Sequence, residues 1–172
     1  MLSVIPTLNT LSDSVAYLEQ SIGNLLAQVK TIRKNVELLQ TIPGVGPHSA
    51  SLIMAEIGDV RRFKNKKALV AFAGVDAPPF QSGTFESKSR HVSKRGSPHP
   101  RRTLFIISSV ILQLSHEDNP VFCFMDKKRS EGKHFYVYIV AGAAKFLRIY
   151  YATVTAYFKT SKYINSLSAI AG

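Results

Sequence analysis

The residues best suited to chemistry lie in a basic, serine-rich segment in the middle of the chain. Residues 81–97 read QSGTFESKSRHVSKRGS. A serine hydroxyl that attacks a phosphodiester needs nearby cations to neutralise the charge that builds on the phosphate oxygens. Ser82 is followed by Gly83, which leaves the hydroxyl accessible, but the segment also contains the rival serines Ser87, Ser89, Ser93 and Ser97. From spacing alone the segment is a phosphate-binding loop rather than a catalytic one.

Positive charge is concentrated around this segment. The chain carries 22 Lys and Arg against 11 Asp and Glu, a formal net charge of +11. Between Arg61 and Arg102 there are eleven basic residues and only two acidic ones, Asp76 and Glu86. Such a block predicts a polyanionic partner, but a solvated basic face or an anionic membrane surface has the same pattern, and charge alone does not separate these readings. The candidate phosphate contacts of the segment are Lys88, Arg90, Ser93, Lys94, Arg95, Arg101 and Arg102.

A glycine turn closer to the N-terminus is a second candidate site. Residues 39–50 read LQTIPGVGPHSA, and an apolar stretch follows them. A helix end, a Pro-Gly-Val-Gly turn and a new helix with small residues at its start are typical of a helix-hairpin-helix. Free N–H groups at the start of such a helix bind a phosphate without reading the base sequence. We expect DNA contacts at Gly44, Val45, Gly46, His48 and Ser49, and the alternative is an ordinary turn between two helices.

Other reactive groups are scattered along the chain. The five histidines show no paired ligand spacing, the single Cys123 cannot build a structural zinc site, and the acidic residues form no obvious cluster for magnesium. A Walker-type glycine loop is also missing. The sequence therefore predicts that this chain binds no metal ion or other cofactor by itself. The lone cysteine and the absence of a secretion signal favour the cytoplasm.

The N-terminal region has a strict apolar period. The spacing alternates four and three through Leu11, Val15, Leu18, Ile22, Leu25, Val29, Ile32, Val36 and Leu39. This heptad pattern predicts one long, coiled-coil-like helix over residues 1–40, which forms a homodimer or a higher oligomer. The alternative is a single amphipathic helix folded onto its own domain.

The remaining elements predict a mainly α fold. We expect helices over residues 66–73, 101–115, 121–129 and 134–159, with a long basic Ser/Gly loop or short hairpin over residues 80–100. Residues 41–160 form the main domain and residues 161–172 a loosely ordered tail. The last helix approaches the length of a membrane span, but Lys145 and Arg148 lie in its middle, where a bilayer disfavours them. We therefore expect a buried or interface helix and no membrane partner.

Taken in order, these motifs resemble the C-terminal domain of DEDD-type insertion-sequence transposases, the insertion-sequence one-ten family. The likeness is carried by TIPGVGPHSASLIMAEIGDVRRF at 41–63, ALVAFAGVDAPPFQSGTF at 68–85, HVSKRGSPHPRRTLF at 91–105 and NPVFCFMDKKRSEGK at 119–133. In that family the serine of the Ser-Gly pair is the nucleophile and forms a covalent protein–DNA intermediate, which implies this role for Ser82. Some members are recombinases guided by an RNA, so the resemblance adds a guide RNA to DNA as a partner. It also implies a bacterial protein associated with the nucleoid.

One departure from the family pattern limits what this chain can do alone. The family's N-terminal half binds Mg²⁺ through four acidic residues, and nothing like it occurs in these 172 residues. The resemblance implies a composite active site of which this chain, a fragment or a truncated product, holds one side and is inactive by itself. The alternative function is a non-catalytic helix-hairpin-helix module that binds DNA in a regulatory role.

Overall fold

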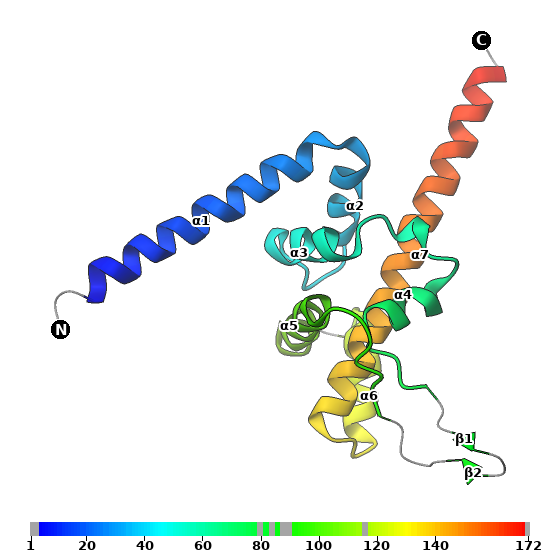
Figure 1. Ribbon diagram of the computed structural model, residues 1–172. Helices are drawn as coiled ribbons and strands as arrows, with labels where there is room; N and C mark the ends of the chain where they lie inside the picture. Colours follow the sequence, from blue (N-terminus) through cyan, green and yellow to red (C-terminus); the bar gives the residue numbers. More distant parts are fainter. Residues whose placement is uncertain (1–3, 79–80, 83–84, 87–90, 115–116, 171–172) are drawn as a thin grey trace.

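The fold is mainly helical, as the sequence predicts, and it is built around one long helix. The computed structural model describes residues 4–78, 81–82, 85–86, 91–114 and 117–170. Helix α7 (Phe135–Ile170) runs through the body of the protein, and α4 (Lys66–Phe72), α5 (Pro98–Leu114) and α6 (Pro120–Ser130) pack along it (Figure 1). Helices α2 (Lys30–Gln40) and α3 (Pro47–Ile57) complete the body, and the short helix η1 (Val60–Arg62) connects α3 to α4.

The apolar composition of α7 follows from its place in the core. Ile139, Ala143, Phe146, Tyr150 and Val154 recur every three or four residues and are buried. This is the spacing of one helix face. Residues 135–161 are long and apolar enough to cross a membrane by length and composition, but half of the most apolar window is buried inside the protein. Burial in the core therefore accounts for about half of this apolar window.

The first two helices depart from the single heptad helix that we expected. Helix α1 (Val4–Gln28) ends before Val29, whose backbone is extended (φ −98°, ψ 107°), and α2 starts at Lys30. A β-branched residue adopts this conformation readily. The break separates the heptads into two groups: Leu39 at the end of α2 is fully buried, whereas Leu11 and Leu18 on α1 stay exposed. Figure 1 shows α1 extending away from the body.

The other elements lie close to their expected positions. Helices α4 and α6 match the expected ranges to within a residue at each end, and α5 begins three residues early, at Pro98. Helix α7 continues to Ile170, through most of the residues expected to form a loose tail. In the basic segment, strands β1 (Gln81–Ser82) and β2 (Phe85–Glu86) form a short antiparallel hairpin, one of the two forms expected there.

Candidate nucleic-acid interface

The candidate serine lies on the hairpin of the basic segment. Ser82 is the second residue of β1, and its backbone pairs with Phe85 of β2. Figure 1 shows the hairpin set apart from the helices. The expected exposure of the Ser82 hydroxyl, and the expected contacts of Lys88 and Arg90, lie outside the residues and side chains that the structure describes.

The segment after the hairpin is held against the end of α4. The Ser93 N–H donates to the Asp76 carbonyl (2.9 Å), and the Lys94 N–H donates to the Gly74 carbonyl (3.2 Å). The Ser93 hydroxyl donates to the Asp76 carboxylate. Ser93, which the sequence suggested as a phosphate contact, is therefore occupied in fixing the segment to the body. Its partner is 17 residues away in the chain, so spacing alone did not reveal it.

A tight turn over residues 94–97 orients the basic side chains. Lys94 has a positive φ of 51° and Gly96 one of 80°. A Cβ atom at Gly96 would lie 2.4 Å from the Phe72 carbonyl oxygen, so only glycine permits this approach of the turn to α4. Lys94 and Arg95 are exposed beside this turn, as is Arg102 in the first turns of α5. The turn thus gathers three exposed cations within a short stretch of chain.

Arg101 has a different position from these three cations. It is partly buried, and its Nη1 donates to the carbonyl oxygens of Arg95 (3.2 Å), Gly96 (3.4 Å) and Ser97 (3.2 Å). One guanidinium nitrogen therefore bonds three consecutive carbonyls of the turn. Of the cations expected to clamp a phosphate, Arg101 is the one whose described contacts stabilise the loop itself.

Two more arginines of the basic block already have partners. The Arg61 guanidinium bonds the Asp59 carboxylate and lies 3.9 Å from the centre of the Phe158 ring. The Arg61 charge lowers the pKa of the Asp59 carboxyl through these hydrogen bonds. Arg62 lies over the rings of Phe63 and Phe72, at 4.7 and 4.9 Å. Arg61 is thus paired with an acidic residue, and the Arg62 guanidinium is positioned by aromatic rings.

The glycine turn lies between α2 and α3. Gly44 has a φ of 90°, and a Cβ there would lie 2.5 Å from Ile111 of α5. The Val45 side chain is buried, and its N–H donates to the Ile42 carbonyl (3.1 Å). Neither group is therefore available for the DNA contact that we predicted at Val45, which leaves only its carbonyl. Asn119, the buried N-cap of α6, donates to the Pro43 carbonyl (3.2 Å) and ties the turn to the body.

The start of α3 is the part of this turn with available donors. Gly46 is the N-cap, and Pro47 has no N–H. The Ala50 N–H donates to the Gly46 carbonyl (3.0 Å) and forms the first hydrogen bond of the helix. The N–H groups of His48 and Ser49 therefore have no acceptor within the helix. The exposed His48 Nδ1 lies 3.1 Å from the Glu19 carboxylate of α1. A carboxylate thus already lies beside the helix start at which we expected a phosphate.

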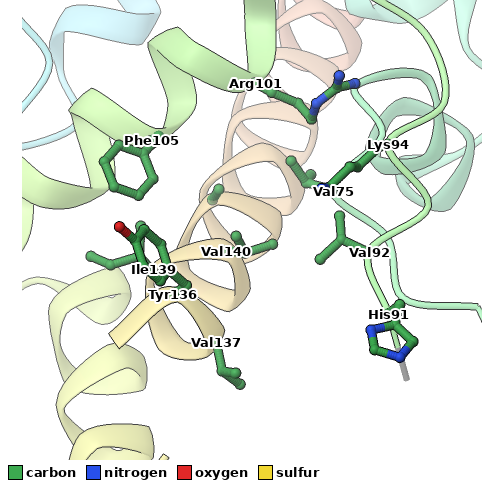
Figure 2. A pocket seen from close by; sticks show the side chains of 11 residues that line it. Val75, His91, Val92, Lys94, Arg101, Phe105, Tyr136, Val137, Ile139 and Val140 are labelled. Carbon is green, nitrogen blue, oxygen red and sulfur yellow. The ribbon is translucent and has the colours of Figure 1, made fainter. Parts of the chain in front are cut away.

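A cavity of about 420 Å³ opens next to the basic turn. It lies between residues 91–94, α5 and the first turns of α7, and its walls are mostly apolar. Figure 2 shows Phe105 and Tyr136 on one side, Val75 and Val92 on the other, and Lys94 and Arg101 at one end. Only Lys94 and Arg101 of its lining were candidate residues, because the sequence gives no sign that α7 meets this loop.

The described residues do not fit a magnesium ion. Within the part of the chain that the structure describes, no group of three His, Cys, Asp or Glu side chains comes together to hold a metal. Of the acidic residues in the basic block, Asp76 accepts from Ser93, and Glu86 lies in β2.

Comparison with known protein families and sequences gives one consistent result. Residues 36–120 match the Transposase IS116/IS110/IS902 family. This range contains α3, the glycine turn, the hairpin, the basic turn and α5. It therefore includes every residue suggested above as a nucleophile or a DNA contact.

Individual relatives extend the likeness beyond this range. The pilin gene-inverting protein of Moraxella bovis is 29% identical over 144 residues, which cover 83% of this chain and 44% of the relative. The transposase for insertion sequence element IS1328 of Yersinia enterocolitica is 29% identical over 103 residues, covering 60% of this chain and 29% of the relative. The transposase for insertion sequence element IS1111A of Coxiella burnetii is 31% identical over 93 residues, covering 52% and 25%. The chain spans less than half the length of these relatives.

Proposed function

We propose, from the match of residues 36–120 to this transposase family, that the chain is the DNA-handling part of a bacterial insertion-sequence transposase or DNA-inverting recombinase. The relatives include both transposases and a gene-inverting protein, and both kinds of protein rearrange DNA. The working partner is then chromosomal DNA in the bacterial cytoplasm. The net charge of +11 supports such a partner.

Within this function, Ser82 is the nucleophile. Its Oγ attacks a phosphorus atom of one DNA strand, an Oγ–P bond forms, and the P–O bond to the neighbouring nucleotide breaks. The serine gives up its proton, and the departing nucleotide oxygen takes one up and leaves as a hydroxyl. The bond energy is kept in the phosphoserine ester, so a hydroxyl of another strand can later displace the serine and complete strand transfer. The family resemblance supports this role, and the hairpin lies at the edge of the body, where a strand has access.

The exposed cations next to the hairpin would stabilise the reacting phosphate and position the strand. Lys94, Arg95 and Arg102 lie within one short stretch, and an arginine suits paired contacts with phosphate oxygens.

The N–H groups of His48 and Ser49 at the start of α3 would hold a second phosphate, as in a helix-hairpin-helix. Magnesium, which the resemblance implies, would be held by an acidic domain on the part of the relatives that this chain does not match.

A chimera tests the role of Ser82. This chain replaces the matching part of the Moraxella bovis relative, and the chimera is incubated with Mg²⁺ and labelled DNA that the relative inverts. We expect a protein–DNA adduct that survives denaturation and is removed by protease. The adduct should be absent in Ser82→Ala and present in Ser97→Ala, a serine of the same basic segment. An adduct that persists in Ser82→Ala would exclude Ser82 as the nucleophile.

DNA binding by the chain alone is tested separately. We expect the chain to bind plain duplex DNA with an affinity that falls steeply as salt increases, because phosphate contacts release counterions. The non-catalytic alternative predicts the same binding but no adduct in the chimera, so the two experiments together separate the two functions. A chain that does not bind duplex DNA at low salt would contradict both.

A further inference from the structure

The cavity beside the basic turn has the size and the lining to take one flat, apolar ring. It holds about 420 Å³, and most of its lining is aliphatic or aromatic, including Val92, Val137 and Val140. Tyr136 is 62% exposed and Val137 53% exposed, so the cavity is open to a ligand from outside. Exposed aromatic and aliphatic side chains at the mouth of a cavity are typical of a ligand site.

Its aromatic wall is already arranged for stacking. The Phe105 and Tyr136 rings lie 6.1 Å apart at an interplanar angle of 27°, and the His134 ring lies 5.6 Å from Tyr136 at 26°. The Tyr136 ring is thus inclined by 26° to 27° to each of the other two rings, and of the three Phe105 and Tyr136 line the cavity. A nucleobase that leaves its duplex finds stacking partners of this kind on proteins that bind single strands.

The charge around the cavity indicates what the ring is attached to. Lys94 and Arg101 line one end and His91 lies at the opposite side of the opening, as Figure 2 shows. None of the described residues that line the cavity is acidic. An apolar interior with a cationic edge complements a base joined to a phosphate, whereas an apolar peptide side chain would offer no counterpart to the Lys94 charge.

We propose that this cavity binds an unstacked nucleobase of the DNA, with its phosphate on the exposed Lys94. The inference rests on the proposed function, because DNA must lie along the basic turn for a base to reach the cavity. It adds a subsite that holds the strand open beside the hairpin. Removal of a base from the duplex has an unstacking cost, which contacts in such a pocket offset.

The test compares two bulged duplexes. One labelled duplex carries a single extrahelical adenine, and the second carries an abasic nucleotide at the same position, so that both bend but only one presents a base. Binding to the 172-residue chain is followed by fluorescence anisotropy. We expect the adenine bulge to bind roughly ten-fold to a hundred-fold more tightly, the range that stacking of one base on an aromatic side chain produces.

Two variants connect this preference to the cavity. Tyr136→Ala removes the exposed stacking ring, and Val137→Trp fills the opening from an exposed position, so both should fold. Each should reduce the ratio of the two affinities to about one, while affinity for plain duplex DNA stays within about two-fold. Tyr17→Ala, which removes an exposed tyrosine of α1, should leave the preference unchanged.

The outcomes separate this inference from the proposed function. If wild type binds plain duplex DNA but binds the two bulges equally, the nucleobase pocket is wrong and the proposed function stands. If Tyr136→Ala and Val137→Trp both keep the preference, the base binds elsewhere and the inference is again wrong. If wild type binds none of the three DNAs, the proposed function fails, and the inference fails with it.

Discussion

Arg101 and Arg102 are neighbours in the chain with different surroundings. Arg101 is partly buried and donates to three carbonyls of the turn over residues 95–97, whereas the Arg102 side chain is exposed. Both were candidate phosphate contacts by residue type, because the sequence shows only that two arginines follow a basic loop. The structure distinguishes a residue that supports the loop from one that faces solvent.

This difference predicts opposite effects of two matched substitutions. Arg101→Ala leaves three carbonyls without their donor and should lower the free energy of unfolding by about 1–3 kcal/mol. Arg102→Ala should change the free energy of unfolding by less than about 0.5 kcal/mol. It should weaken DNA binding and reduce the slope of log affinity against log salt concentration by about one. Urea denaturation and anisotropy at several salt concentrations measure the two effects. Equal loss of stability in both variants would contradict the support role of Arg101.

At the scale of single residues, the sequence predicted candidate segments but not the contacts that fix them to the body. It placed the candidate nucleophile and the cations in one segment, and the structure brings Lys94, Arg95 and Arg102 close to one turn. It did not predict that Asp76 would engage Ser93 or that Asn119 would hold the glycine turn. These contacts join residues far apart in the chain, and nothing in local spacing encodes them.

At the scale of elements, α1 and α3 meet at the proposed phosphate site. Glu19 on α1 contacts His48 at the second position of α3. The N-terminus of a helix attracts anions, because its N–H groups are free and its dipole is positive there. The Glu19 carboxylate therefore lies where it would compete with a DNA phosphate for the start of α3.

Removal of this carboxylate charge should strengthen DNA binding. Glu19→Gln keeps the size of the side chain but removes the negative charge, and we expect the affinity for duplex DNA at low salt to rise by about two-fold to five-fold. Gln20→Glu on the same helix adds a charge on a different face and serves as the control for a general effect of charge. An affinity that is unchanged in Glu19→Gln, measured by anisotropy, would mean that DNA does not approach the start of α3.

Helix positions were predicted well, but the path of the chain between α1 and α2 was not. The periods of α5 and α7 identify a buried face, and the core contains these residues. The heptads before Leu39 continue without interruption in the sequence, yet the backbone leaves the helix at Val29. An apolar period shows which residues share a helix face. It does not show that the helix is interrupted between the apolar residues of α1, which are exposed, and Leu39 of α2, which is buried.

At the scale of the whole molecule, the basic turn and the apolar stripe of α1 lie on different parts of the protein. Lys94, Arg95 and Arg102 are exposed at or near the turn over residues 94–97, while a series of exposed apolar residues follows α1, which extends away from the body (Figure 1). Leu11, Leu18 and Leu25 are 57%, 58% and 64% exposed. A leucine stripe of this length on a helix is an interaction surface in most proteins. The period of α1 fits a second copy of the same helix.

We therefore expect the chain to self-associate through α1. Leu18→Glu places a charge in the stripe of both copies and should weaken association roughly a hundred-fold or more, because each buried leucine contributes about 1.5–3 kcal/mol. Gln20→Glu introduces the same charge off the stripe and should leave the association unchanged. Sedimentation velocity over a range of protein concentrations measures all three proteins. If the wild-type chain stays monomeric at every concentration, the α1 stripe serves some other contact. If Leu18→Glu and Gln20→Glu weaken association equally, charge and not the stripe controls assembly.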